Sequence, residues 1–431
     1  ASASNEWIVS GARSASGKPL LANDPHLGLT APGMWHLARI VTPDFKASGA
    51  AIPGQPFFMV GQNGHLSWGL TTTHADTQDL FIEKLHPDDP GQYLTPNGSL
   101  PFETRIEEIK VRGRGTPERL VVRSTRHGPV ISDISPDSGE VAGSGYVIAL
   151  SFAALREDDH TANAIFGMNT AQTVSDFRNA LRGFHAPMQN VAYAHTDGSF
   201  GFVAAGRVPI RPGGPGNIPH EGWTGANDWA GFIPFDDLPQ LENPESSVII
   251  NANNRVAARD YPHVIANDWP EGFRAQRIKD LLAESSLHTL DSFAAIQNDV
   301  VSLGALTLIE ATTSPFTNGG KDTEVTRLLK NWDGSMSKDA TAPLLYAAFA
   351  DTLRKQLIDD ELGERANDYR GAPVHVLSNM ISGNSSWCDD VTTTHPDSCE
   401  TTVSIALTRA LGTIESSQGY HREEWRWGNS H

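Results

Sequence analysis

The chain has 431 residues and a net charge of −18 with neutral histidines, from 33 Lys and Arg against 51 Asp and Glu. Nucleic acids and anionic lipids bind basic surfaces, so this charge argues against both as partners. No apolar run approaches the ~20 residues that span a bilayer, and 39 Gly and 27 Pro are typical of a turn-rich globular protein.

The first 75 residues predict short strands and tight turns. Apolar runs at 7–9 and 19–22 flank Ser16-Gly17-Lys18, which is a hairpin signal. A further run at 57–60 leads into the turn Gln62-Asn63-Gly64. Alternating apolar and polar residues then predict a β-rich excursion at about 80–150.

Later segments change from strands to helices. Residues 162–182 have the apolar spacing of a helix, and strands are expected again on both sides of Asp197-Gly198 and at 248–250. Beyond about residue 274, Phe293, Ile296, Val300 and Leu303 recur at helical spacing, and Pro343 opens another long helix. This order predicts a layered α+β fold rather than a regular βαβ alternation.

The two cysteines, Cys388 and Cys399, lie close together in a polar segment. Two free thiols and a disulfide are both open, and we favour the disulfide. A structural disulfide indicates an exported protein, so a periplasmic or secreted location is expected.

Several common catalytic signatures are missing from the sequence. It has no Gly-x-Ser-x-Gly elbow, no phosphate-binding loop, no His-Glu-x-x-His and no dinucleotide-binding glycine motif. The sixteen histidines are scattered singly, so each is better explained as a surface or hydrogen-bonded residue than as a metal ligand.

The most distinctive strings are Ser4-Asn5-Glu6-Trp7-Ile8-Val9 and residues 17–27. They resemble the start of the catalytic chain of the penicillin acylase family. These N-terminal-nucleophile amidohydrolases include penicillin and cephalosporin acylases and acyl-homoserine-lactone acylases. The similarity continues in order at 58–69, 187–194, 206–211 and 251–254, so it covers nearly the whole chain.

The resemblance implies a four-layer αββα sandwich with a mainly helical insertion. The core would cover residues 4–275, with the β-rich excursion at about 80–150, and the mainly helical region would cover 276–431. It also implies a smaller α-subunit from the same precursor and further C-terminal core segments, both outside this chain.

The resemblance assigns the nucleophile to Ser4, with its own α-amine as the base. A free α-amine has a pKa of about 7.7–8.0, so near neutral pH a fraction is able to accept the hydroxyl proton. Ala1-Ser2-Ala3 precede Ser4 here, and a peptide bond removes that basicity. These three residues are interpreted as an unprocessed or modified precursor segment or as tag residues, and self-cleavage between Ala3 and Ser4 is expected before activity.

Four other positions match catalytic residues of the family. The backbone N–H of Thr72 and the side-chain amide of Asn253 match oxyanion donors, each worth roughly 3–4 kcal/mol. His26 matches a supporting position beside the nucleophile, and Arg274 matches an arginine near the substrate entrance. A turn asparagine at 253 and an exposed structural arginine at 274 stay open as alternatives.

The resemblance also implies positions that bind the substrate and a metal ion. Those lining the acyl pocket are Leu27, Val60 and Leu70, whose aliphatic side chains favour fatty-acyl amides, including acyl-homoserine lactones, with some β-lactams possible. No organic cofactor is implied. A structural Ca²⁺ is implied at Asp76, Asp79 and the Gln78 carbonyl. Ile265 stands where the family has a further aspartate, and Asp268 is a candidate replacement. The alternative for the three pocket residues is that they are ordinary core residues. The alternative for Asp76 and Asp79 is that they are solvated loop aspartates.

We therefore predict hydrolysis of the amide bond of N-acyl compounds through an acyl-enzyme on Ser4. A catalytically dead homologue that binds acyl ligands is the rival hypothesis. A conventional Ser-His-Asp hydrolase loses support because the elbow motif is missing.

Overall fold

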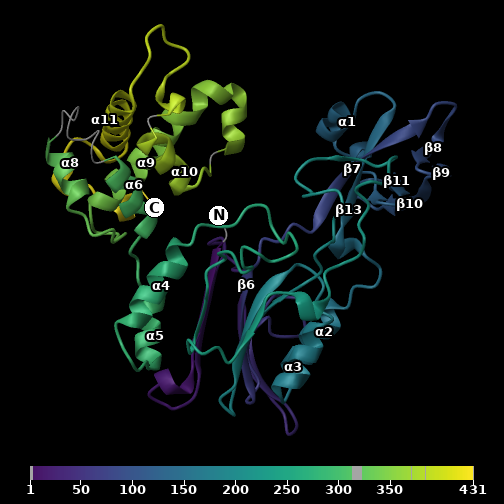
Figure 1. The fold of residues 1–431 in the computed structure, drawn as a ribbon, viewed down its shortest axis with the longest axis horizontal. Helices are drawn as coiled ribbons and strands as arrows, with labels where there is room; N and C mark the ends of the chain where they lie inside the picture. Colours follow the sequence, from purple (N-terminus) through teal and green to yellow (C-terminus); the bar gives the residue numbers. More distant parts are fainter. Residues whose placement is uncertain (1–2, 313–322, 370, 384, 431) are drawn as a thin grey trace. The chain divides into compact units, whose positions relative to one another are not determined.

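The computed structural model describes residues 3–312, 323–369, 371–383 and 385–430. They form two compact units (Figure 1). Unit 1 comprises the residues up to Pro270 together with Ser285–Leu290, and unit 2 comprises Glu271–Glu284 and the residues from Asp291 onward. Unit 1 mixes sheets and helices and unit 2 is mainly helical, which confirms the α+β class predicted from the sequence.

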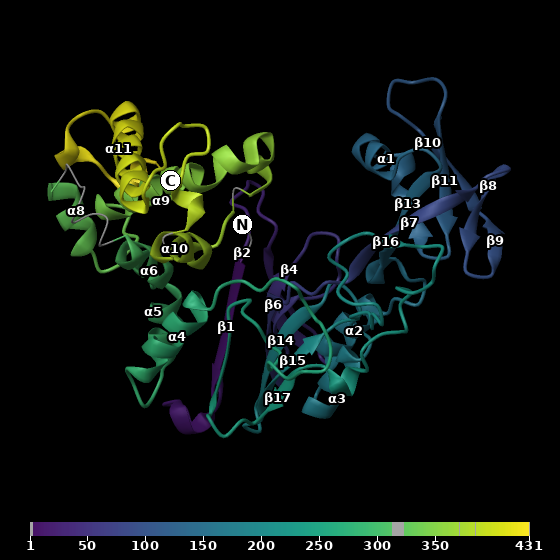
Figure 2. The same ribbon diagram turned by 45° about the horizontal axis from the view of Figure 1, so that its top comes forward.

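A seven-stranded antiparallel sheet forms the centre of unit 1, with the order β17-β15-β14-β6-β5-β4-β3 (Figure 2). Strands β14 and β15 form the hairpin expected at Asp197-Gly198, and Gly198 takes a φ of 111° that favours glycine. The seven strands are β3 (His36–Val41), β4 (Lys46–Ala51), β5 (Val60–Gln62), β6 (Leu66–Thr72), β14 (Gln189–His195), β15 (Phe200–Ala205) and β17 (Gln240–Glu242).

A second, three-stranded sheet is stacked on the first. Its central strand β1 (Ala3–Val9) pairs antiparallel with β2 (Leu20–His26) and with β18 (Val248–Asn251). Both β1 and β2 contact β6 and β14, so the two sheets face each other. The apolar part of the space between them is filled by side chains such as Ile8 and Ile249. The candidate nucleophile Ser4 therefore lies on the central strand of the smaller sheet.

Two helices, α2 (Thr161–Thr170) and α3 (Val174–Leu181), cover the other face of the seven-stranded sheet (Figure 1). The buried Phe177 ring of α3 lies 6.1 Å from the Trp68 ring of β6 and 5.4 Å from the Tyr193 ring of β14, between ring centroids. The expectation of one helix over 162–182 is wrong. Thr173 is an N-cap whose side chain accepts from the Asp176 N–H, and this capping box starts a new helix.

The β-rich excursion extends from one end of this body (Figure 2). It contains two small sheets and one short helix. At its centre the buried His127 ring bridges two carboxylates, with Nδ1 2.6 Å from Glu83 Oε1 and Nε2 2.9 Å from Asp228 Oδ1. The elements are β7 (Gln78–His86), β8 (Asp89–Thr95), β9 (Gly98–Pro101), β10 (Glu103–Ile109), β11 (Glu118–Thr125), β12 (Gly128–Pro129), α1 (Pro136–Ala142), β13 (Tyr146–Phe152) and β16 (His220–Glu221).

Unit 2 packs its helices around a core that includes Leu353 of α9 and Val403 of α11. The helix expected through Phe293 and Leu303 is two helices, because the chain between them leaves the helical path and Val301 pairs with Ser335. The helices are α4 (Phe273–Ala283), α5 (Leu290–Gln297), α6 (Leu303–Ala311), α8 (Thr323–Lys330), α9 (Ala342–Leu362), α10 (Val374–Ser382) and α11 (Cys399–Gln418).

Cys388 and Cys399 form a disulfide in unit 2, with a Cα–Cα distance of 4.9 Å. Both residues are buried, and Cys399 begins α11. The bridge thus closes the polar loop at the start of a core helix. None of the helices in the described ranges is long and apolar enough to cross a membrane.

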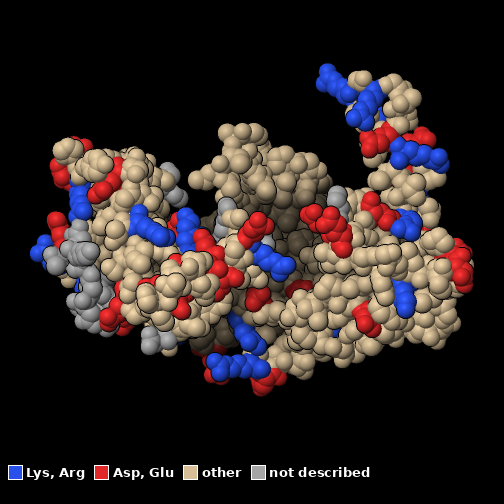
Figure 3. Space-filling model, turned by 90° about the horizontal axis from the view of Figure 1, so that it is seen from above, with Lys and Arg blue, Asp and Glu red and all other residues tan. Residues whose placement is uncertain are grey.

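Charged side chains of both signs are interspersed on the face seen in Figure 3, with Asp and Glu beside most of the Lys and Arg groups. Over the whole sequence the acidic side chains exceed the basic ones by 18. A net charge this far from zero opposes self-association through repulsion.

Candidate active site

The candidate nucleophile Ser4 is buried, with 7% of its surface exposed. It pairs in register with Pro25 of β2. Its backbone N–H donates a hydrogen bond to Asn253 Oδ1 at 2.7 Å. This nitrogen carries Ala3 in the present sequence, and it would be the α-amine after cleavage of the Ala3–Ser4 bond. Asn253 therefore holds the atom on which the expected base depends.

Asn253 follows β18 in a tight turn and is almost completely buried. Its φ of 64° lies in the left-handed region, which asparagine tolerates better than most residues. Its Nδ2 donates to the Thr72 carbonyl at 2.8 Å. The structure thus brings Ser4 of β1, Thr72 at the end of β6 and Asn253 in the turn after β18 together. The Thr72 group bound by Asn253 is the carbonyl, so the role of the Thr72 N–H stays a prediction.

His26 ends β2 and pairs in register with Ala3, the residue before the nucleophile. Its Nε2 lies 2.7 Å from Asp24 Oδ2, and the same carboxylate oxygen accepts from Asn5 Nδ2 at 3.0 Å. Its side chain is 43% exposed. This position beside the Ala3–Ser4 bond is compatible with the supporting role expected from the sequence.

Two of the three expected acyl-pocket residues pack in one apolar cluster. Leu70 of β6 is buried in the core beneath α2 and α3, and Val60 of β5 packs against the same core. Leu27 directly follows β2, is partly buried and is not a member of that cluster among the described residues. The arrangement fits a core role for Leu70 as well as an acyl-binding role.

The expected metal segment contains two carboxylates held by one arginine. The buried Asp79 accepts from Arg211 Nε at 2.8 Å and from the Trp229 indole N–H, while its Oδ1 accepts no hydrogen bond among the described residues. Asp76 Oδ1 lies 3.3 Å from Arg211 Nη2. Burial raises the pKa of Asp76, the Arg211 cation opposes this, and Asp79 adds to it. Gln78, between them, begins β7.

Asp76 also lines a cavity of about 460 Å³. Asn267 Nδ2 donates to Asp76 Oδ2 at 3.0 Å, and the Asp76 N–H donates to the Ile265 carbonyl at 2.8 Å. Asp268, the candidate replacement ligand, lines the same cavity together with Asn217. Carboxylate oxygens of Asp76 and Asp268 at one cavity are ligands of a kind that Ca²⁺ accepts, whereas in this structure Arg211 supplies the positive charge to both Asp76 and Asp79. No group of three or more His, Cys, Asp or Glu side chains in the described part is placed to hold a metal by itself.

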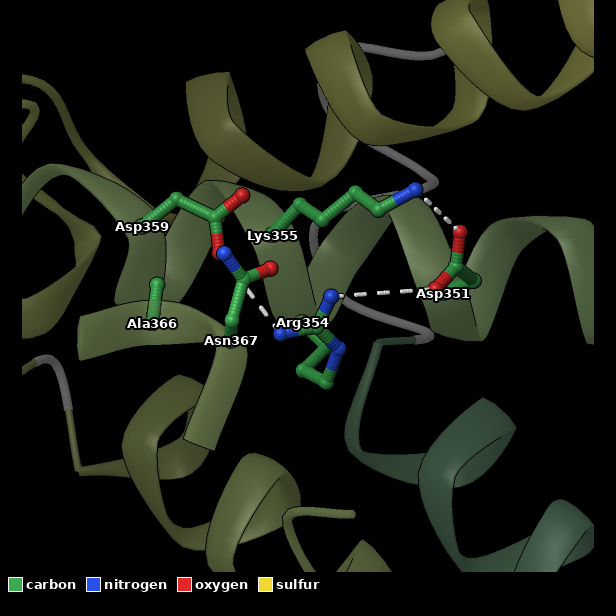
Figure 4. Close-up of a pocket in the computed structure, with 6 residues that line it drawn as sticks. All are labelled: Asp351, Arg354, Lys355, Asp359, Ala366 and Asn367. Atoms are coloured by element: carbon green, nitrogen blue, oxygen red, sulfur yellow. Dashed lines mark hydrogen bonds and ion pairs between the residues drawn. The ribbon is translucent and has the colours of Figure 1, made fainter. Parts of the chain in front are cut away.

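Unit 2 holds the remaining predicted residue. Arg274 lies in the first turn of α4. Unit 2 also has a cavity of about 270 Å³ on α9, into which the buried Arg354 projects (Figure 4). Its guanidinium lies 3.8 Å from Asp351 and 3.6 Å from Asp359, and Lys355 pairs with Asp351. The two cations and two carboxylates balance, so this cavity has no strong preference for an ion of either sign.

Sequence reasoning missed a set of buried polar residues beneath the candidate site. These residues are all buried and form one hydrogen-bonded network, in which Thr71 contacts each of the other three: Glu6, Asn190 and Asn251. A signal was present, because Ser4-Asn5-Glu6 puts polar residues on both faces of the strand, including the face that carries Ile8. That face is directed into the space between the two sheets.

Comparisons with known proteins point to one family. The penicillin amidase family model matches residues 1–431. The acyl-homoserine lactone acylase QuiP of Pseudomonas aeruginosa is 30% identical over 100% of this chain and 54% of that protein. The penicillin acylase 2 proenzyme of Pseudomonas sp. is 32% identical over 82% of this chain and 45% of that protein. The chain therefore spans about half the length of the curated relatives that it matches.

The fold comparison points to the same group of proteins. A thermostable penicillin G acylase from Alcaligenes faecalis superposes with a TM-score of 0.79 at 20% sequence identity, covering 98% of this chain and 80% of that chain. At this identity the superposition establishes the fold. The family match over the whole sequence, the shared fold and the grouping of Ser4 with Asn253 and Thr72 lead to one conclusion: the chain belongs to the penicillin amidase family.

Proposed function

We propose that the chain is the catalytic part of a hydrolase that cleaves the amide bond of N-acyl compounds through an acyl-enzyme on Ser4. One observation carries the proposal: Asn253 contacts both the Ser4 nitrogen and the end of the strand that carries Thr72. The nucleophile, its expected base and the expected oxyanion donors therefore meet at one buried place.

The chemistry starts after cleavage of the Ala3–Ser4 bond has freed the α-amine. Ser4 Oγ attacks the amide carbonyl carbon while its proton passes to the amine. The Thr72 N–H and Asn253 Nδ2 stabilise the negative oxygen of the tetrahedral intermediate. When the carbon–nitrogen bond breaks, the ammonium returns the proton to the leaving nitrogen. Water then attacks the ester by the same route and releases the acid and free Ser4.

The names of the relatives and three side chains support the proposed substrate class. The similar proteins are described as acyl-homoserine lactone acylases and penicillin acylases. Leu27, Val60 and Leu70 are aliphatic, and such a surface accommodates a flexible alkyl chain. We place aliphatic N-acyl homoserine lactones first and penicillins second.

A smaller subunit from the same precursor is part of this proposal. Edge strand β3 and the segment before it expose Leu29 fully, Leu37 at 79% and Met34, Ile40 and Val41 at about half their surface. Exposed apolar edges of this kind mark interaction sites. Leu37→Glu should therefore weaken co-purification of the partner and leave the fold of the isolated chain unchanged.

Calcium and an exported location complete the proposal. Asp76, Asp79, Asp268 and the Gln78 carbonyl would hold the ion, whose role would be to stabilise the link between the excursion and the core. The disulfide supports export, because the cytosol keeps most thiols reduced.

The central test is mass spectrometry of the processed protein, with Ser4 as its first residue, during turnover of an N-acyl homoserine lactone. An acyl adduct on Ser4 that is absent in Ser4→Ala is expected. Turnover of the substrate by the Ser4→Ala variant would contradict the proposal. Binding of the lactone without any hydrolysis or adduct would favour the rival, a homologue that only binds acyl ligands.

A further inference from the structure

A fully buried carboxyl lies two residues after the candidate nucleophile. Glu6 is 0% exposed and is on the same face of β1 as Ser4, directed into the space between the two sheets. Its Oε2 accepts no hydrogen bond within the described part of the chain. Glutamate is rarely buried without a cationic partner, since desolvating the charge is costly. The proposed reaction steps do not use this group.

Hydrogen bonds connect Glu6 to the nucleophile through three residues. Glu6 Oε1 lies 3.2 Å from Thr71 Oγ1, and Thr71 Oγ1 lies 2.6 Å from Asn251 Oδ1. Asn251 Oδ1 accepts the Asn253 N–H at 2.9 Å, and Asn253 Oδ1 accepts the Ser4 N–H at 2.7 Å. The path therefore passes through the expected oxyanion donor.

The number of available protons decides the direction of these bonds. A backbone N–H can only donate, so the Asn253 N–H fixes Asn251 Oδ1 as an acceptor. The Thr71 hydroxyl has a single proton, and the 2.6 Å contact with Asn251 Oδ1 requires it. Asn190 Nδ2 donates to Thr71 Oγ1 at 3.1 Å. Toward Glu6 the Thr71 oxygen is thus an acceptor, and Glu6 must supply the proton.

We propose that Glu6 is a neutral hydrogen-bond donor that positions the oxyanion donors Thr72 and Asn253. This inference rests on the proposed function. Thr71 immediately precedes Thr72, and Asn251 fixes the turn that contains Asn253. Ionised Glu6 would take the Thr71 proton for itself. Two acceptor oxygens, Thr71 Oγ1 and Asn251 Oδ1, would then face each other at 2.6 Å, and the turn would loosen.

The surroundings favour the neutral carboxyl. Burial is the largest influence and raises the pKa of Glu6 well above its ordinary value, and the Ala192 N–H opposes this only in part. A proton directed from Thr71 to Glu6 would also lower this pKa, but the 2.6 Å contact with Asn251 Oδ1 directs that proton to Asn251. Strands β6 and β18 bring no charged residue. The titratable residues of β2 and β14 contact groups other than Glu6. Asp24 contacts His26, Tyr193 contacts Arg178, and His195 contacts Asp197.

The test compares two substitutions in the processed enzyme with its partner subunit. Glu6→Gln keeps a neutral donor, whereas Glu6→Met keeps the volume and removes the donor. Wild-type activity should decline as pH rises through the folded-state pKa of Glu6. Glu6→Gln should retain kcat within about twofold and should lack that decline. Glu6→Met should lower kcat at least tenfold with KM unchanged, because oxyanion donors act mainly in the transition state. The matched control is Glu83→Gln, a fully buried glutamate in the excursion that should leave kcat unchanged.

The outcomes separate this inference from the proposed function. Equal loss of kcat in both Glu6 variants, or no loss in either, would overturn the positioning role. Infrared spectra should show a protonated-carboxyl band at neutral pH that disappears in Glu6→Gln, and absence of that band overturns the inference whether or not the enzyme is active. A band in a wild-type protein that hydrolyses no acyl amide would support the neutral donor and reject the proposed function.

Discussion

Asn253 offers the sharpest test of the proposed site, because its backbone and its side chain contribute separately. Its side-chain amide binds the Ser4 nitrogen and the Thr72 carbonyl, and its backbone has a φ of 64°. Asn253→Gly removes the amide and tolerates this φ. Asn253→Ala removes the same amide and adds the cost of a left-handed Cβ, roughly 1–2 kcal/mol of folding stability.

The expected loss in kcat is the same for both variants. Removing one oxyanion donor costs about 2.7–4 kcal/mol of transition-state stabilisation, or a factor of about 10²–10³. The assay is kcat for an N-acyl homoserine lactone, measured beside thermal unfolding. Asn253→Ala should be less stable than Asn253→Gly while the two kcat values agree within a few-fold.

The chain has a matched control for the backbone effect. Asn243 also has a positive φ, of 44°, and its Oδ1 accepts the Phe200 N–H at 3.0 Å at the end of a β-hairpin. Asn243→Ala should lose stability and keep kcat. A tenfold or larger loss of kcat in this control, or wild-type kcat in Asn253→Gly, would refute the assignment of Asn253 as an oxyanion donor.

Three further predictions concern stability. Replacing Cys388 and Cys399 by serine opens a loop of about 12 residues and should cost unit 2 about 3 kcal/mol in chemical denaturation; a loss below about 1 kcal/mol would contradict the loop-entropy argument. Chelation with EGTA should lower the melting temperature, Ca²⁺ should restore it, and Asp76→Asn should abolish the response; a chelator-insensitive wild type would remove calcium from the proposal. Burial raises the pKa of Glu6 in the folded protein. The contribution of neutral Glu6 to the free energy of unfolding is therefore fully present below the ordinary pKa of about 4.3. It is lost as pH rises through the folded-state pKa. Glu6→Gln should therefore match the wild type in melting temperature at acidic pH and exceed it at alkaline pH, and a constant offset would argue against titration.

The sequence predicted the fold class and the family well, because long strings of residues carry that information in order. It located strand hairpins where Gly198 or Gly17 allows a positive φ, and it placed Pro343 correctly in the first turn of a helix. Helix ends were less predictable. Apolar spacing continues across Thr173 and Val301, whereas a capping box and a single β-bridge interrupt the helices there.

The sequence indicated polar residues on both faces of the first strand, but it did not show that the polar side chains meet between two sheets. Polar residues on a strand normally point to solvent, and nothing in Ser4-Asn5-Glu6 marks Glu6 as buried. In the structure the polar residues of four strands meet inside the protein and form hydrogen bonds with one another, although Glu6 Oε2 accepts none among the described residues. Only the register of β1 with β18, which places Glu6 opposite Asn251, shows that this face is internal.

The apolar edge at β3 has a consequence for how such a protein is made. An exposed strand edge with Leu37 and Ile40 can pair with any other chain that reaches it first. A covering segment tethered in the same polypeptide has an effective concentration in the mM range, far above that of a separately synthesised partner. Synthesis as one precursor would therefore allow the covering segment to bind this edge faster than other chains can aggregate on it. Cleavage of the precursor afterwards would leave an assembly that two separately synthesised subunits form much less efficiently.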